Sequence, residues 1–389
     1  MTVVIRLAFV LLLAGCASPA HPPLAVAAHS EQVAAAAPAA APVAGTGVLD
    51  LRALPDLAGI IPRLADMRVV FVGERHDQYA HHLTQLEIIR RLHELHPRLA
   101  IGMEVFQQPF QPVLDDYIAG KLSEREMLRD SEYFSRWRMD YQLYAPILRY
   151  AREQRLPVVA LNLPAELTRK VAREGMAALS AEERAQLPAE IDRSDQDYHQ
   201  RLQKIFARHP GTENGFERFL DVQLLWDEGM AERAADWLAA HPDYRMVVLA
   251  GSGHLAWGSG IPQRLRRRLP VDSAIVLNGW DGELDPGLAD FILLTESRAQ
   301  PKTARIGVLF EAGQEALQVR KCIPGTPCSE AGLKPGDRIL AIDDTSVASI
   351  ADLRLAMWDK QPGDTVTLRI LRRSWFAAPS ELSYTIVLR

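Results

Sequence analysis

The chain has 389 residues, of which 48% are hydrophobic and 24% are charged, and its formal net charge is −5. A mildly acidic chain without a basic stripe interleaved with aromatic residues argues against an electrostatic nucleic-acid binder, so we expect no nucleic acid as a partner. The length exceeds that of one typical domain, which predicts two.

The first residues predict export and a lipid anchor. The apolar run at 7–13 is too short to span a bilayer and is typical of a secretory signal peptide. Leu-Ala-Gly-Cys16 follows and resembles the lipobox of bacterial lipoproteins, which implies cleavage before Cys16 and lipidation of that residue. Ala17 and Ser18 then imply sorting to the outer membrane, facing the periplasm. An ordinary signal peptide over residues 1–16 is the alternative.

The next segment predicts a tether. Residues 17–47 are rich in alanine and proline and carry almost no charge. Such a segment buries too little apolar surface to offset its ordering entropy, so we expect it to be disordered. As a coil it would span roughly 30 Å between the membrane and the folded chain.

Strand and helix signals alternate from residue 48 to about residue 297. Apolar runs predict strands at 67–72, 99–103, 156–161, 244–250, 271–277 and 289–294. Apolar residues at helical spacing predict helices at 79–95, 109–119, 141–154, 164–174 and 213–240. This order predicts an α/β domain with a mostly parallel sheet flanked by helices. Residues 163–243 lack a clear strand, so we expect a helical insertion or cap there.

Polar and ionisable side chains follow the ends of the predicted strands. In chain order these residues are Glu74 and His76, Glu104, Asn162, and His254. Because the carboxyl ends of parallel strands lie at one edge of a sheet, we expect the side chains to converge although they are far apart in the sequence. The sequence therefore predicts a functional site at this edge.

Two kinds of hydrolytic chemistry fit this set of residues. His76, Glu104 and His254 could hold a divalent metal that activates water, with Glu74 as the general base. A histidine alone could instead act as the base. The sequence contains neither a His-Glu-x-x-His helix nor a Gly-x-Ser-x-Gly turn, so it lacks these two familiar hydrolase patterns.

A series of short motifs over residues 60–280 points to a family. They are residues 73–77 with His81, His82 and Gln85; 103–106 with Gln111; 144–148; 161–164; 219–231; and 250–254 followed by 260–262. As an ordered set they resemble the ChaN-like haem-binding lipoproteins. That family is similar to the Tiki metalloproteases and the erythromycin esterases, which share a glycine-glutamate-histidine element and a late glycine-histidine element.

The resemblance implies a membrane-anchored protein that binds haem or an iron complex in iron uptake, with a pair of stacked haems at a homodimer interface. It also implies a tyrosine as the iron ligand, and phenolate is a hard anion suited to ferric iron. Tyr198 is the best candidate in this sequence, with Tyr79 and Tyr144 as rivals. The other expected cofactor-binding residues are His76, His82 and His254. The alternatives are a metal-dependent hydrolase or protease of the cell envelope and a scaffold without activity.

Residues 303–389 predict a small β-rich domain. Pro335-Gly336 is a turn signal before an apolar strand, and Ser349 is the expected N-cap of a helix that ends near residue 358. The run at 331–343 resembles the bacterial PDZ signature, which implies binding of an extended or C-terminal peptide. The expected peptide-binding residues are Ile306, Gly307, Val308 and Leu309 in the carboxylate loop, and Leu353 and Met357 on the helix.

Two cysteines remain once Cys16 is lipidated, and they are Cys322 and Cys328. An even number of cysteines in an oxidising compartment predicts a disulfide, with two free thiols as the alternative. We expect such a bridge to stiffen its own loop without contact with the peptide-binding groove.

Overall fold

The computed structural model describes residues 52–207, 215–280, 282, 284–311, 317–373 and 378–389. The predicted signal peptide, Cys16 and the tether at 17–47 lie outside the described residues. The chain divides into two units, and the unit Pro55–Arg389 contains both domains considered below. In the described ranges no helix combines the length and apolar character that crossing a bilayer requires.

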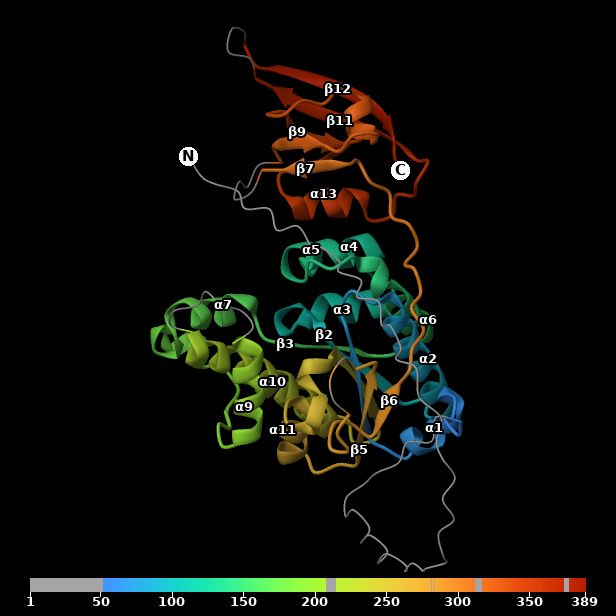
Figure 1. The fold of residues 1–389 in the computed structure, drawn as a ribbon, viewed down its shortest axis with the longest axis vertical. Helices are drawn as coiled ribbons and strands as arrows, with labels where there is room; N and C mark the ends of the chain where they lie inside the picture. Colours follow the sequence, from blue (N-terminus) through green and yellow to red (C-terminus); the bar gives the residue numbers. More distant parts are fainter. Residues whose placement is uncertain (1–51, 208–214, 281, 283, 312–316, 374–377) are drawn as a thin grey trace, which may run out of the picture. The chain divides into compact units, whose positions relative to one another are not determined.

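The larger domain is built on a parallel sheet, which confirms the predicted fold class. In the described part of the chain its six strands lie in the order β3-β2-β4-β1-β5-β6 (Figure 1). They are β1 Val69–Glu74, β2 Leu99–Gln107, β3 Val158–Asn162, β4 Arg245–Gly251, β5 Ser273–Asn278 and β6 Phe291–Leu293. All neighbouring pairs are parallel. Each strand coincides with one of the apolar runs, and β1 to β5 are largely buried, as expected for a parallel sheet covered on both faces.

The register of the central strands places polar side chains at one edge. β1 and β4 are neighbours, and Glu74 pairs with Gly251 at their carboxyl ends. On the other side of β4, β2 pairs Met103 with Leu249, so Glu104 also lies beside the end of β4. Three strand ends therefore meet where the sequence predicted a site.

Helices cover both faces of the sheet because alternate strand residues face opposite sides. On one face Val70 and Val72 pack with apolar residues of α1 Leu57–Ala65, α2 Tyr79–Leu95, α3 Gln111–Ile118 and α6 Ala145–Gln154. On the other face Val69 and Phe71 pack with α10 Gly215–Ala240 and α11 Ile261–Arg268. α4 Glu124–Asp130 and α5 Tyr133–Arg136 extend the first layer. Figure 1 shows α2 and α6 on the opposite side of the sheet from α10 and α11.

The segment between β3 and β4 is helical in its described residues, as predicted. It contains α7 Ala165–Glu174, α8 Ala181–Arg184, α9 Gln196–Phe206 and the long α10. α9 begins at a hydrogen-bonding cap, since the Asp195 side chain accepts a bond from the backbone amide of Tyr198. This cap fixes the start of the helix that carries Tyr198.

The small domain is β-rich, also as predicted. A four-stranded antiparallel sheet has the order β10-β9-β11-β12, and β7 pairs with β8 beside it. The strands are β7 Val308–Phe310, β8 Val319–Cys322, β9 Arg338–Ile342, β10 Thr345–Ser346, β11 Thr365–Arg372 and β12 Ser380–Val387. Two helices, α12 Pro327–Glu330 and α13 Ile350–Met357, complete the domain. Ser349 caps α13 through a capping box with Asp352.

Candidate functional site

The first half of the site lies at the end of β1. The buried carboxylate of Glu74 faces the His76 ring, with 2.6 Å between Oε1 and Nδ1. The His76 side chain is 31% exposed, and its ring makes an edge contact with Trp137 at 4.7 Å between centroids. Burial lowers the pKa of His76, but the hydrogen bond with Glu74 and the charge of Glu104 outweigh burial, so the pKa is raised. His76 is therefore anchored at one ring nitrogen and open to solvent on part of its surface.

His82, in the first turn of α2, contacts both Glu74 and the backbone of His76. Its Nδ1 lies 3.1 Å from the Gln85 Oε1, and its Nε2 lies 3.2 Å from the His76 carbonyl and 3.3 Å from a Glu74 oxygen. The Gln85 amide donates to the carbonyl of Val72 in β1 at 3.0 Å. Because both ring nitrogens of His82 already face partners, His82 positions its neighbours and offers no open nitrogen to a ligand.

The second half of the site lies at the ends of β2 and β4. Glu104 accepts a hydrogen bond from the Gly251 amide at 2.7 Å. His254, in the short helix η4 Ser252–His254, has its Nδ1 2.5 Å from the Asp227 Oδ1 and its Nε2 3.6 Å from the Glu104 Oε1. Burial lowers the pKa of His254, but Asp227 and Glu104 outweigh burial and raise the pKa to about 9. His254 is therefore a protonated imidazole between two carboxylates at neutral pH.

Gly251 lies between the two halves of the site, next to the His76 ring and bonded to Glu104. A Cβ at this position would lie 3.0 Å from the His76 Cε1 and 3.7 Å from a Glu104 oxygen. The lack of a side chain thus lets the His76 ring approach the end of β4. The structure brings together Glu74, His76, Glu104 and His254, whereas the Asn162 side chain donates to the backbone carbonyl of Glu104, at 3.2 Å.

The third carboxylate of the site, Asp227, was not among the residues predicted from the sequence. Asp227 is contributed by α10, where it is buried beside Glu228. Two acidic residues among buried apolar positions of one helix are unusual, since such carboxylates are rarely buried unless they are paired. That pattern was the available signal, and it does not reveal which histidine is the partner.

Tyr198 lies behind the site with its hydroxyl turned inward. It is 4% exposed, and it donates a hydrogen bond to the Asp227 Oδ2 at 2.6 Å. Burial and the charge of Asp227 raise its pKa well above the ordinary value, although the Arg264 guanidinium lies 4.7 Å from the ring centroid. A neutral donor of this kind differs from the anionic iron ligand that the family resemblance implies. The ligand assignment stays a prediction, and this arrangement favours a positioning role.

Of the two rival tyrosines, Tyr144 is as closed to a ligand as Tyr198, whereas Tyr79 is partly exposed. Tyr144 is buried against His82, and its hydroxyl accepts a bond from the Trp137 indole at 3.1 Å. Burial and the charge of Glu74 raise its pKa well above the ordinary value. Tyr79 is half-buried on α2 among the apolar residues of that layer.

The geometry of the candidate ligands gives little support for a divalent metal site. Among the described residues no group of three or more His, Cys, Asp and Glu side chains is arranged to hold a metal ion. The His254 Nδ1 and one Glu104 oxygen are already bonded to Asp227 and Gly251. His76, Glu104 and His254 thus lie in one cluster of acidic and basic side chains, and the role of this set as a metal site stays a prediction.

Comparison with known families is decisive for the larger domain. The family model described as haem-binding uptake, Tiki superfamily, ChaN matches residues 60–265. The chain belongs to this family. A model of the PDZ domain matches residues 304–375, so both family predictions are confirmed.

Two individual similarities accompany these matches. The chloroplastic protein RETICULATA-RELATED 5 of Arabidopsis thaliana is 28% identical over 243 residues, which are 55% of this chain and 31% of that protein. The match thus spans less than a third of that relative's length. A solved structure of cofacial heme binding to ChaN of Campylobacter jejuni has 17% identity and a TM-score of 0.51, over 62% of this chain and 93% of that chain. This likeness shows a shared fold.

Proposed function

We propose that this ChaN-family protein binds haem or a related iron complex at the cell envelope and acts in iron uptake. Membership of a family described by haem-binding uptake supports the ligand class. The observation that carries the proposal is His76, a partly exposed imidazole held by a buried carboxylate at the carboxyl edge of the sheet. Ligand sites of open α/β sheets lie at that edge.

His76 fits a ligand better than the other candidates do. Of the four side chains expected to bind the cofactor, His82 and Tyr198 are buried and fully bonded, and His254 lies between two carboxylates. The His76 Nδ1 faces Glu74, and within the described residues its Nε2 has no hydrogen-bond partner. A carboxylate behind one ring nitrogen is the usual arrangement of a metal-binding histidine, because it fixes the tautomer and the ring orientation. Bound haem would supply a ferric iron to such an imidazole.

A hemin titration of residues 48–389, which contain the whole compact unit, tests the proposal. We expect a saturable change in the Soret band with a stoichiometry near one hemin per chain. Because the solved ChaN structure has cofacial haems, we also expect the mass measured by light scattering to double as hemin saturates the protein. A linear, unsaturable Soret signal would contradict haem binding.

The envelope location rests on the lipobox. A lipid on Cys16 would hold the folded domains at the outer membrane, facing the periplasm, through the tether at 17–47. Labelled palmitate should enter the native chain and should not enter a Cys16→Ser variant. Labelling of both chains, or of neither, would contradict lipidation at this residue.

The PDZ domain supplies a second binding activity. We propose that an extended peptide lies beside β7 and α13, with its terminal carboxylate at the turn formed by Ile306 and Gly307. Leu353 and Met357 are half-buried and pack on the core of the domain, which supports an apolar lining next to the peptide.

Hydrolysis is the second candidate function, and the protonated His254 favours it. An imidazolium between Asp227 and Glu104 can donate a proton to a leaving group. The Glu74 carboxylate lies 2.6 Å from the His76 Nδ1, so it can orient the ring and stabilise the imidazolium that forms when His76 acts as a general base. A panel of ester and peptide substrates tests this function. Turnover that a His254→Gln variant abolishes would support it, and equal background rates in both proteins would contradict it.

A further inference from the structure

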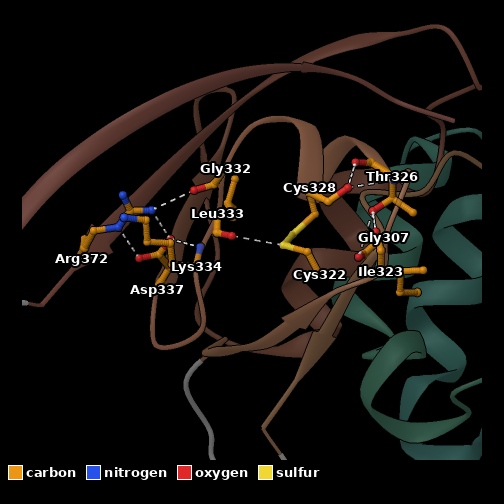
Figure 2. Close-up of a disulfide and its surroundings, with 11 residues drawn as sticks. Gly307, Cys322, Ile323, Thr326, Cys328, Gly332, Leu333, Lys334, Asp337 and Arg372 are labelled. Atoms are coloured by element: carbon orange, nitrogen blue, oxygen red, sulfur yellow. Dashed lines mark hydrogen bonds and ion pairs between the residues drawn. A yellow bond between two sulfur atoms is a disulfide. The ribbon is translucent and has the colours of Figure 1, made fainter.

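The disulfide of the small domain closes a loop next to the expected peptide site. Cys322 ends β8, Cys328 lies in α12, and the two are bonded across a sequence separation of 6. Cys328 is fully buried, whereas Cys322 is half-buried. Figure 2 shows the bridge between the loop that carries Thr326 and the turn at Gly332–Lys334.

The bridged loop binds the backbone of the carboxylate turn, contrary to our expectation that it would not contact the groove. The Ile323 amide donates to the Gly307 carbonyl at 2.9 Å, and the Cys328 amide donates to the Ile306 carbonyl at 2.9 Å. The Thr326 hydroxyl donates to the Ile323 carbonyl at 2.6 Å and lies 3.4 Å from the Gly307 carbonyl. Two consecutive carbonyls of the turn are therefore held by residues inside the disulfide loop.

These contacts fix the direction of the turn's amide groups. In a planar trans peptide the N–H points opposite to the preceding C=O. Because the carbonyls of Ile306 and Gly307 point toward the bridged loop, the N–H groups of Gly307 and Val308 point away from it. Gly307 has φ +81°, and a side chain there would collide with Thr326, so the turn is closely matched to the loop. Two adjacent amides with a common direction are suited to a carboxylate.

At its Cys322 end the bridge lies against the turn at Gly332–Lys334, which is held by contacts of its own. The Cys322 Sγ is 3.5 Å from the Leu333 carbonyl. The segment after this turn contains Asp337, whose carboxylate accepts a bond from the Lys334 amide at 2.8 Å and two from the Arg372 guanidinium at 2.6 and 2.7 Å. These bonds, drawn in Figure 2, do not depend on the sulfur bridge. Opening the bridge would thus leave the carboxylate turn held only by its hydrogen bonds to the loop, while Asp337 and Arg372 keep their part of the fold in place.

We propose that the Cys322–Cys328 disulfide holds the carboxylate turn at Ile306–Gly307 in its binding form, so that the PDZ domain captures a C-terminal peptide tightly when the bridge is closed and weakly when it is reduced. The proposal rests on the peptide binding proposed above. A dithiol reductant supplies the two electrons and two protons that convert the bridge into two thiols, and it becomes a disulfide itself. Attack at the Cys322 sulfur is favoured because that residue is half-buried.

The ligand of the closed form is a peptide with a free terminal carboxylate and an apolar last side chain. The carboxylate meets the amides of Gly307 and Val308. The apolar side chain meets Leu353 and Met357, which are half-buried and pack on the core of the domain. A peptide with an amidated C-terminus lacks the charge that these amides recognise.

Peptide binding to residues 48–389 in both redox states tests the proposal. The probe is an array of decapeptides that end in Ala, Val, Leu or Phe, each made with a free carboxylate and with a terminal amide. The tightest binder is then titrated by fluorescence anisotropy before and after treatment with dithiothreitol. We expect reduction to weaken binding about tenfold, as would follow if the released turn adopts its binding form about a tenth of the time. Amidated peptides should bind weakly in both states.

Two variants separate the role of the bridge from loss of folding. A Cys322→Ala/Cys328→Ala double variant should bind like the reduced protein and should not respond to dithiothreitol. Thr326→Val keeps the bridge but removes the hydroxyl bond to Ile323, so it should weaken carboxylate binding even if the double variant does not fold. Circular dichroism of the reduced protein shows whether the domain remains folded.

The outcomes are distinct. Equal affinity of the folded oxidised and reduced proteins would overturn the proposed role of the bridge, and so would equal binding of free and amidated peptides. Capture of no peptide in either state would instead contradict the proposed peptide binding itself.

Discussion

At the scale of single residues, Gly251 determines how closely His76 approaches the end of β4. An added Cβ would lie 3.0 Å from the His76 Cε1, so the ring must move by a few tenths of an ångström. We expect Gly251→Ala to weaken hemin binding while the protein remains folded, as measured by a Soret titration and by circular dichroism. Gly253→Ala is the matched control, because a Cβ at Gly253 meets no atom within 4 Å. Equal loss of affinity in both variants would contradict this role of Gly251.

His254 makes stability depend on pH. Its pKa is 6.5 in the unfolded chain and about 9 in the folded protein, so folding favours the protonated form. The stabilisation is fully present below pH 6.5 and is lost as pH rises through about 9. We expect the free energy of unfolding in urea to fall across this window, by at most about 1.4 kcal/mol per pH unit. In a His254→Gln variant this part of the slope should disappear, and an unchanged slope would contradict the assignment.

The residues of the site differ in how far the sequence could predict them. Glu74, His76, Glu104 and His254 follow apolar strands directly, so their convergence follows from parallel topology. Asp227 comes from the middle of a helix, and the rotation of that helix depends on packing that no local pattern reveals. For the same reason the sequence suggested Tyr198 as a ligand and did not reveal that its hydroxyl bonds Asp227.

At the scale of elements, close packing between α10 and the residues after β3 depends on Gly229. An added Cβ would lie 2.6 Å from the Leu163 Cγ. In an exposed helix, replacing glycine by alanine stabilises by about 1 kcal/mol, but overpacking in a core costs about 1–3 kcal/mol. We therefore expect Gly229→Ala to lower the free energy of unfolding in urea.

A Leu163→Ala change provides the control for this prediction. Because it removes the atoms that the new methyl would meet, its effect and that of Gly229→Ala should be less than additive in a double-mutant cycle. Strict additivity, or a more stable Gly229→Ala protein, would show that the two side chains do not collide.

Strands and helices could be predicted where the spacing of apolar residues clearly fitted one of the two. All six strands of the large sheet coincide with apolar runs, and α2 spans Tyr79–Leu95 as predicted. Shorter helices such as α4 and α5 were not predicted, and for the helices that were given bounds the differences lie mainly at their starts. Short 3-10 turns at Gln108–Phe110 and Tyr141–Leu143 precede α3 and α6, and each α-helix has a proline in its first turn. Proline is tolerated there because the first amides of a helix have no partner within the helix, so apolar spacing alone places the start too early.

At the scale of the whole molecule, one parallel sheet collects side chains that are distant in sequence into one acid–base cluster. Membership of a haem-binding family supports haem as the proposed ligand class. Within the cluster we propose His76 as the contact because it combines a carboxylate partner with exposure. The small domain matches the PDZ model, and we propose that it adds a second binding activity, for peptides.

We propose that His76, rather than Tyr198, contacts the haem iron. Hemin titrations of His76→Ala and Tyr198→Phe beside the unchanged protein test this assignment, with His93→Ala, on the far end of α2, as the histidine control. We expect His76→Ala to lose at least about tenfold in affinity and to shift the Soret maximum, while the other two variants retain both. If His76→Ala keeps its hemin affinity and Soret maximum while Tyr198→Phe loses both, the assignment to His76 is wrong and Tyr198 is the iron ligand.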